Sequence, residues 1–331
     1  MRQTFYFLTV LLICIGCINC SPLLAKIPVV FDTDANNEVD DQHAMAYLFF
    51  NGKTFDVKGV TVHATKHGGN IDEHYAEAVR IVRMCNVNGI PTLKGANGNF
   101  ETIAPTLDKP DFDGLEAVNF IIAKAKEMKD EKLVLIAVGK LTNVALAVKK
   151  DPSITGKIRL VWLGANYPEP GEYNLENDIA SMNYLLETDI EFEIVTVRYG
   201  KPSGTAAVIG YKEDILKKMP GKGPAVEPVT GRHGNKKFTN FGDYSINLFE
   251  NCHNYTTPPG RPLFDMAAVA IVKNPAWAEV KTIPAPIMRN ERWVNRPDNK
   301  RTVKLWENFA IKSIMDDFYH TMDNYTLIEV K

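Results

Sequence analysis

Residues 27–41 read IPVVFDTDANNEVDD, an apolar run that changes abruptly into a run of carboxylates. Ile27–Phe31 has the continuous apolar character of a strand that is covered on both faces of a sheet. Asp32 to Asp41 holds five carboxylates and no base, whereas residues 1–31 hold no carboxylate. We therefore expect a buried parallel strand whose carboxyl end carries a concentrated negative charge.

The rest of the chain alternates short β-branched runs with amphipathic stretches, an order that predicts an α/β fold. Four later strands are expected, at Val57–Val62, Leu133–Val138, Ile158–Leu163 and Phe192–Val197. The helices between the strands are expected at Asp40–Phe50, Asp72–Met84, Leu115–Met128, Thr142–Lys149 and Ala180–Leu186. This order predicts an open, mostly parallel, twisted sheet with helices on both faces. Such sheets bind ligands at the carboxyl ends of their strands, where the acidic run falls.

The segment from Pro202 to Pro262 departs from this alternation, because it is rich in Gly, Pro, Asn and Lys. It predicts a loop-rich insertion with two short helices, Lys212–Lys218 and Tyr244–Phe249. A lid over the sheet and a peripheral excursion without function are both open interpretations. Beyond the insertion we expect two further helices, Phe264–Val272 and Trp306–Met322.

The first 25 residues are predicted to be an export signal. Arg2 gives a positive start, and Phe5–Ile18 is a 14-residue apolar run that is too short to span a bilayer comfortably. Residues 14–17 (CIGC) resemble an imperfect lipobox, so the exported protein could be a lipoprotein tethered at Cys17 or a free secreted or periplasmic protein. Residues 26–331 are expected to form a single domain.

The composition excludes some classes of function. Lys and Arg number 38 and Asp and Glu number 40, so the net charge of −2 provides no basic field for general nucleic-acid binding. No later stretch is long and apolar enough for a membrane span. Outside the export signal only Cys85 and Cys252 remain, and both a single disulfide and two separate thiols are open. We expect a small-molecule ligand.

The carboxylates after the first strand predict a site for a hard divalent cation. Packing several carboxylates there costs repulsion and desolvation, which a cation removes. Donor sets made of oxygen suit Ca²⁺ or Mg²⁺ rather than Zn²⁺. An EF-hand is rejected, because Asn37 and His43 stand where that loop needs Gly and Glu. Asp32-Thr-Asp34 after a strand also fits a haloacid-dehalogenase-type phosphatase, although the later Lys and Asp pair of such enzymes is not evident.

Four segments in the same order resemble the inosine–uridine-preferring nucleoside hydrolase family. The first, Asp32-Thr-Asp34 followed by Asp40-Asp41 and an alanine-rich stretch, is similar to the calcium site of that family. The others are Gly139-Lys-Leu-Thr-Asn143, then Asn166 with Gly171-Glu-Tyr-Asn174 and Asp178, and finally Pro262-Leu-Phe-Asp265. Any one of them is a weak signal, and together they are specific.

The resemblance implies an N-glycosyl hydrolase that splits ribonucleosides into free base and ribose with a Ca²⁺-bound water. Asp34 would be the general base. The implied Ca²⁺ ligands are the carboxylates of Asp34, Asp41 and Asp265 and the main-chain carbonyl of Val138. The implied substrate-binding residues are Asp40, Asn166, Glu172 and Asn174 for the ribose hydroxyls and Phe264 for the base. The family is commonly dimeric or tetrameric, so a homo-oligomer is also implied.

Two departures from the family pattern leave alternatives open. Five residues separate Asp34 from Asp40 where the family commonly has three, so Asn37 or Glu38 could join the metal site. Phe264 stands where many members have a His that is thought to protonate the leaving base. Replacement acids could be His63, His67, His233 or His253. A calcium-bearing sugar- or nucleoside-binding protein without turnover is therefore a further alternative.

Aromatic residues could line a base pocket. Tyr173 lies between Glu172 and Asn174 and is the better candidate, whereas Trp162 lies inside a predicted strand and belongs in the core. Tyr167 and Trp293 are the other candidates.

Overall fold

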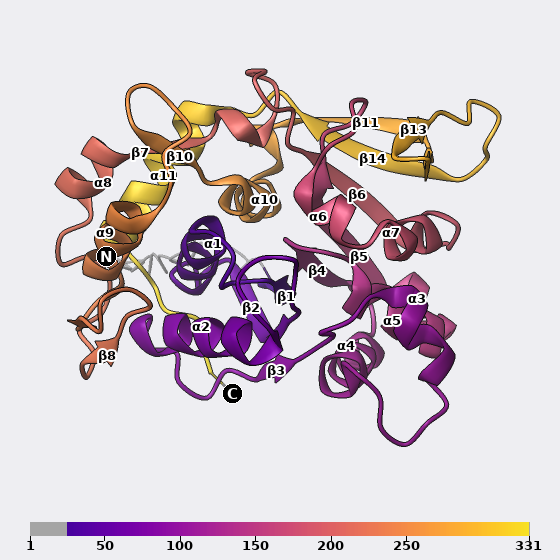
Figure 1. Cartoon of the computed structure of the whole chain (residues 1–331), viewed down its shortest axis with the longest axis horizontal. Helices are drawn as coiled ribbons and strands as arrows, with labels where there is room; N and C mark the ends of the chain where they lie inside the picture. The colour runs from indigo at the N-terminus through magenta and orange to yellow at the C-terminus, as the bar shows by residue number, and fades with distance from the viewer. Residues whose placement is uncertain (1–24, 331) are drawn as a thin grey trace, which may run out of the picture.

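Strand β1 (Ile27–Thr33) lies inside an eight-stranded sheet in the computed structural model, which describes residues 25–330 (Figure 1). The strand order among these residues is β11-β14-β6-β5-β4-β1-β2-β3. β1 pairs in parallel with β2 on one side and with β4 on the other. The predicted export signal, apart from residue 25, lies outside the described residues.

The sheet confirms the predicted open, mostly parallel architecture. Every pairing within it is parallel except that of β11 with β14. The remaining strands of the sheet are β2 (Phe55–Val62), β3 (Thr92–Lys94), β4 (Leu133–Ala137), β5 (Ile158–Ala165), β6 (Glu191–Thr196), β11 (Glu279–Pro284) and β14 (Thr302–Glu307). Three small antiparallel pairs lie outside it: β7 (Ile209–Tyr211) with β10 (Gly260–Pro262), β8 (Val229–Thr230) with β9 (Lys237–Phe238), and β12 (Ile287–Arg289) with β13 (Arg292–Val294).

Helices cover both faces of the sheet, because alternate residues of its strands feed two separate cores. Val29 and Phe31 of β1 pack into one core, and Val30 between them packs into the other. The first core is shared with α1 (Asp40–Phe49), α2 (Ile71–Met84), α9 (Phe241–Asn251), α10 (Phe264–Lys273) and α11 (Ile311–Asp323). The second is shared with α3 (Phe100–Ile103), α4 (Leu115–Glu127), α5 (Thr142–Lys150) and α7 (Ile179–Leu186). The remaining α-helices of residues 25–330 are the short helices α6 (Tyr173–Asn177) and α8 (Lys212–Lys218).

The expected helix at Trp306–Met322 is wrong at its start. Residues 302–307 form β14, which pairs in parallel with β6, and α11 begins only at Ile311. Trp306 is buried in this strand, where its indole donates a hydrogen bond to Glu193 of β6. Asn308 then adopts a left-handed conformation with a φ of 55°, which separates the strand from the helix.

The loop-rich insertion packs along α1 and α2 (Figure 1). His43 of α1 is hydrogen-bonded to Ser245 of α9, and the hydroxyl of Tyr244 donates to the buried Glu77 of α2. Both cysteines of the described chain are free thiols, Cys85 buried and Cys252 half-buried, so no disulfide joins them. Among residues 25–330, no helix combines the length and the apolar character that a membrane crossing needs.

Candidate active site

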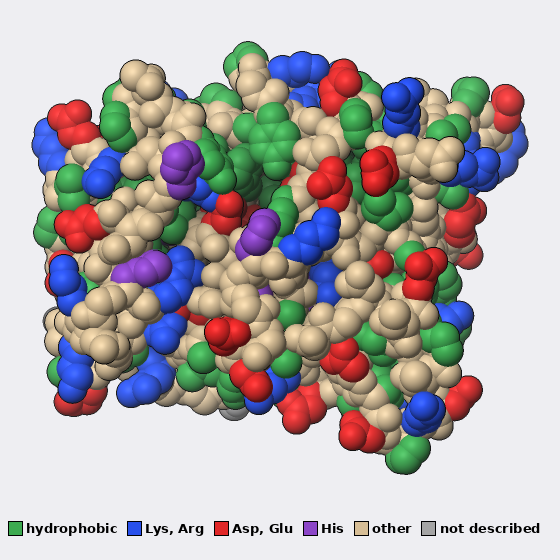
Figure 2. Space-filling model, viewed as in Figure 1, with side chains coloured by type: hydrophobic (Ala, Val, Ile, Leu, Met, Phe, Trp, Pro, Cys, Tyr) green, Lys and Arg blue, Asp and Glu red, His purple; other side chains and the backbone are tan. Residues whose placement is uncertain are grey.

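A pocket of about 870 Å³ opens at the carboxyl ends of β1 and β4. Asp34 follows β1, Val138 follows β4, and the first turns of α1 and α10 also reach it. Figure 2 shows the hollow on this face of the molecule, with carboxylates among apolar side chains. The parallel sheet thus brings together residues that lie far apart in the sequence, as such sheets do at their ligand sites.

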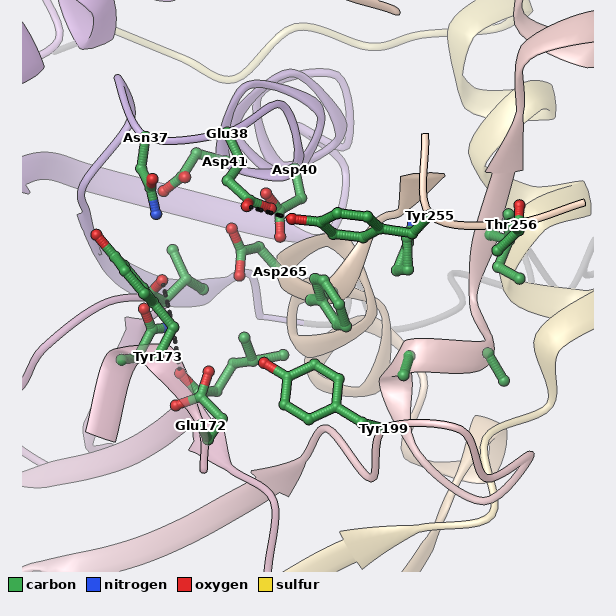
Figure 3. A pocket seen from close by; sticks show the side chains of 18 of the residues that line it. Asn37, Glu38, Asp40, Asp41, Glu172, Tyr173, Tyr199, Tyr255, Thr256 and Asp265 are labelled. Carbon is green, nitrogen blue, oxygen red and sulfur yellow. Dashed lines mark hydrogen bonds between the residues drawn. The ribbon is translucent and has the colours of Figure 1, made fainter. Parts of the chain in front are cut away.

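Three buried carboxylates meet in this pocket (Figure 3). Asp40 and Asp41 lie in the first turn of α1 and Asp265 in the first turn of α10, and each offers an oxygen within 4.8 Å of the others. Burial, with Asp34 close by, raises the pKa of Asp40 to about 7. Burial and the neighbouring carboxylates also raise the pKa of Asp41 and Asp265 well above the usual range. Without a cation, these three groups are therefore hard to ionise together.

This donor set fits a hard divalent cation. All the side-chain donors are carboxylate oxygens, and the helix starts add a favourable field for negative charge. The hydroxyl of Thr33 donates to Asp41, which orients that carboxylate. Val138 also lines the pocket, and its carbonyl accepts a hydrogen bond of 3.0 Å from the amide of Asn174. A carbonyl has two lone pairs, so this bond leaves one for a cation.

The two aspartates of the Asp-Thr-Asp segment have different surroundings. Asp34 lines the pocket and accepts a hydrogen bond of 2.5 Å from Thr65 Oγ1. As its side chain stands, it lies outside the set of three carboxylates that could share one ion. Asp32 is fully buried beneath the pocket, where it accepts hydrogen bonds from Thr61 and Asn143 and lies 3.1 Å from His63 Nδ1. The geometry therefore brings Asp34, and not Asp32, to the candidate site.

Besides Asp40, two of the predicted ribose-binding residues line the pocket, Glu172 and Asn174. Glu172 is buried, accepts a hydrogen bond from the amide of Leu175 at the start of α6, and has its pKa raised to about 7 by burial. Asn174 donates to the carbonyls of Val138 and Leu163, so its amide is fixed between β4 and β5.

Asn166 does not join them. Its amide nitrogen donates to the carbonyl of Pro170, and its amide oxygen accepts from the backbone N–H of Tyr199. Asn166 is not among the residues that line the pocket. It closes the turn after β5 and holds the segment of Tyr199 against that turn.

The predicted aromatic residues separate in the same way. Tyr173 lines the pocket. Trp162 is buried in the core and donates to the carbonyl of Gly139. Tyr167 and Trp293 pack edge-to-face at 5.4 Å, away from the pocket lining.

Sequence reasoning missed two aromatic residues of the pocket, Tyr199 and Tyr255. Tyr199 follows β6 and packs edge-to-face on Phe264 with ring centroids 6.0 Å apart, and Tyr255 comes from the insertion (Figure 3). Tyr199 could have been found from its place, since it stands just after a predicted parallel strand. No sequence signal points to Tyr255. The insertion therefore contributes to the pocket wall and is not a peripheral excursion.

The candidate acids are placed differently from one another. His67 lines the pocket and stacks on Tyr173 at 5.4 Å. His63 is buried beside Asp32, and neither His233 nor His253 lines the pocket. The residue directly before Asp265 is Phe264, which lines the pocket but has no proton to donate.

The long loop between Asp34 and Asp40 is held by two arginines of the insertion. Arg232 donates to the carbonyls of Asn36 and Glu38 at 3.0 and 2.8 Å. Arg261, which is buried, forms an ion pair with the carboxylate of Glu38. The extra residues of this loop thus connect the carboxylate site to the insertion.

Residues 29–312 match the model of the inosine-uridine preferring nucleoside hydrolase family. The chain belongs to this family. Membership of the nucleoside hydrolases supports an N-glycosyl hydrolase that acts on ribonucleosides, and it favours neither a phosphatase nor a binding protein. The resemblance drawn from the four segments is thereby confirmed.

Individual nucleoside hydrolases and related proteins show the same likeness. A probable uridine nucleosidase 1 of Oryza sativa subsp. japonica is 31% identical over 133 residues, which is 38% of either chain. The solved plant nucleoside hydrolase PpNRh1 superposes with a TM-score of 0.70 at 17% identity, over 90% of this chain and 99% of that one. An inosine-uridine preferring nucleoside hydrolase from Bacillus anthracis gives 0.65 at 19% identity, over 90% and 99%. At these identities the structures show a shared fold.

Proposed function

We propose that this nucleoside hydrolase cleaves the N-glycosidic bond of ribonucleosides with the help of Ca²⁺. The observation that carries the proposal is the meeting of Asp40, Asp41 and Asp265 in one open pocket. Three buried carboxylates with raised pKa values are unfavourable in an empty site and favourable around a cation.

Asp34, Asp41, Asp265 and the carbonyl of Val138 would hold the ion. When bound, Ca²⁺ would supply a water of lowered pKa and bind the ribose hydroxyls beside it. Asp34 would have to turn from Thr65 toward the three other carboxylates, which a rotation of a short side chain allows. Mg²⁺ also prefers oxygen ligands, but it accepts fewer of them from the protein. The donor set therefore favours Ca²⁺.

The chain's own residues divide the remaining work. Asp34 accepts the proton of the attacking water, because it faces the pocket next to the three buried carboxylates. Asp40, Glu172 and Asn174 accept or donate hydrogen bonds at the ribose hydroxyls and fix the sugar for attack. The carboxylates around the sugar also stabilise the positive charge that develops on it as the C–N bond breaks. Phe264 and the tyrosines beside it contact the base.

The test combines substrates, a chelator and single variants. The protein is incubated with inosine, uridine and p-nitrophenyl phosphate, with and without chelator, and released base, ribose and phosphate are measured. We expect base release that the chelator abolishes. Asp34→Asn should lower kcat by at least about a hundredfold, as the loss of a general base does. Asp316→Asn, on the exposed face of α11, is the matched control.

The other outcomes would each reject part of the proposal. Release of phosphate would favour a phosphatase, and binding of nucleoside without turnover would favour a binding protein. Metal content is measured independently by elemental analysis, with Asp41→Ala as the variant. An unchanged content in that variant would show that the ion lies elsewhere.

We also propose that the protein is exported, on the sequence of residues 1–25 alone. Arg2 and the apolar run Phe5–Ile18 support this. Mass spectrometry of the protein from membrane and soluble fractions distinguishes a lipid-tethered protein from a free one, since the tethered protein begins at a lipid-modified Cys17. An intact N-terminus in the cytoplasm would overturn the proposal.

A further inference from the structure

We propose that the base end of the pocket is built for a positively charged base, so that the preferred substrates are cationic N-ribosides such as ribosyl pyridinium compounds. The inference rests on the proposed function, because the ribose, the water and Asp34 are those of the same site. It is carried by the aromatic wall, the charge of the pocket and the arrangement of its proton donors.

Three aromatic rings line the pocket, those of Phe264, Tyr199 and Tyr255, and Figure 3 shows the two tyrosines beyond the carboxylates. The two tyrosines are 45% and 54% exposed, which is high for such large side chains. Exposed ring faces that line a pocket attract cations, and aromatic cages bind alkylated ammonium groups in this way. One face of the Tyr255 ring is already covered by a cation, since the guanidinium carbon of Arg261 lies 3.8 Å from its centroid, so the other face and the rings of Tyr199 and Phe264 remain for a ligand.

The pocket carries an excess of negative charge even with a divalent ion in place. Six carboxylates line it, Asp34, Glu38, Asp40, Asp41, Glu172 and Asp265, and one of them, Glu38, is neutralised by its ion pair with Arg261. Among the described residues that line it, Lys201 is the only lysine or arginine. A base that departs as an anion is therefore destabilised here, whereas a cationic base is attracted.

The base end also lacks a ready proton donor. The hydroxyl of Tyr255 donates to the carboxylate of Glu38 at 3.2 Å, so its proton is already engaged. Burial and the charge of Asp40 raise the pKa of both Tyr199 and Tyr255, and Glu172 adds to the effect on Tyr199, which weakens both as acids. Phe264 has no proton to give.

The one histidine that lines the described pocket, His67, belongs to the opposite wall. It stacks on Tyr173, and Figure 3 shows Tyr173 and Tyr255 on opposite sides of the carboxylates. A neutral purine or pyrimidine needs a proton on its leaving nitrogen. The aromatic wall at the base end does not offer that proton.

A cationic base needs no such proton. The water oxygen forms a bond to C1′, the bond from C1′ to the ring nitrogen breaks, and its electron pair goes to that nitrogen, which neutralises the ring. Asp34 takes the proton of the water and releases it to solvent. The products are ribose, a neutral base and one proton.

The experiment compares three ribosides on the full-length protein with Ca²⁺. Nicotinamide riboside is cationic, p-nitrophenyl riboside is neutral but leaves without protonation, and inosine is neutral and needs protonation. We expect kcat/KM to fall about tenfold from the first to the second, from the loss of the cation–π contact. A further fall of about a hundredfold to inosine is expected, from the missing acid.

Two variants test the aromatic wall. Tyr255→Leu removes the ring and should raise KM for nicotinamide riboside about tenfold more than for p-nitrophenyl riboside. Tyr255→Phe keeps the ring and should cause a clearly smaller change in that ratio. Thermal unfolding of each variant establishes that it is folded.

The outcomes distinguish a failure of this inference from a failure of the proposed function. Hydrolysis of inosine or p-nitrophenyl riboside as efficiently as nicotinamide riboside would overturn the inference and leave the proposed function standing. If none of the three is hydrolysed, the proposed function fails. Calorimetry with 1-methylnicotinamide and nicotinamide then still tests the charge preference, and equal affinities would reject it.

Discussion

The two aspartates that flank Thr33 predict opposite consequences for the same substitution. Asp32 is buried and accepts hydrogen bonds of 2.6 and 2.8 Å from Thr61 and Asn143, whereas Asp34 faces the pocket. Asp32→Asn should lower the free energy of unfolding by about 2 kcal/mol, because the two hydrogen bonds then go to a neutral amide oxygen instead of a carboxylate and are weaker. Asp34→Asn should leave it nearly unchanged or raise it. Urea unfolding of both variants in chelator measures this, and equal losses would contradict it.

His43 predicts a pH dependence of stability. Its ring is buried against Phe241, Phe249 and Phe318, and burial lowers its pKa to about 4. In the unfolded chain His titrates near 6.5, so between pH 6.5 and 4 the unfolded state binds the extra proton. Stability from this residue is thus complete above pH 6.5 and falls by about 3 kcal/mol toward pH 4.

The variant His43→Gln isolates that contribution. It cannot titrate, so the difference in unfolding free energy between wild type and variant should shrink as the pH falls from 7 to 4.5. Urea unfolding in chelator at several pH values gives this difference. Curves that stay parallel over the whole range would show that His43 does not titrate differently on folding.

Among the structural elements, the loop before α1 depends on the insertion for its shape. Arg232 binds two of its carbonyls, those of Asn36 and Glu38. A lysine keeps the charge but not the forked geometry. We expect Arg232→Lys to weaken Ca²⁺ binding about tenfold, as the loss of supporting contacts behind a metal site does. Calorimetry measures the affinity, with Arg289→Lys at the exposed end of β12 as the control, and equal affinities in the two variants would reject the role of Arg232.

At the scale of the whole molecule, the ion should stabilise the fold. The proposed Ca²⁺ site joins the ends of β1 and β4 to the first turns of α1 and α10, so an unfolded chain cannot form it. A ligand at a hundred times its Kd adds about 2.7 kcal/mol to the free energy of unfolding. We expect Tm to rise by several degrees on addition of Ca²⁺, by calorimetry. The rise should vanish in Asp41→Ala, and a rise that survives there would place the stabilising ion elsewhere.

Most of the sheet and its helices could be predicted, because each element buries its own apolar pattern. The strand at 158–163 and the helix at 264–272 lie within β5 and α10. The wrong start of the helix expected at Trp306–Met322 belongs to an element whose partner lies far away. β14 is completed by β6, more than a hundred residues earlier, and an amphipathic pattern alone does not distinguish such a strand from the start of a helix.

The sequence by itself determined the family, five strands of the sheet and the carboxylates that gather after β1, since these are written in local patterns along the chain. Only the tertiary structure decided which of them face one another. In the tertiary structure Asp34 faces the pocket and Asp32 does not, Asn166 closes a turn, and Tyr199 and Tyr255 line the pocket wall. The physical reason is that hydrophobic periodicity reports how a segment is buried, whereas a site depends on packing between segments that lie far apart in the sequence. The ion pair between Glu38 and Arg261 is such a contact.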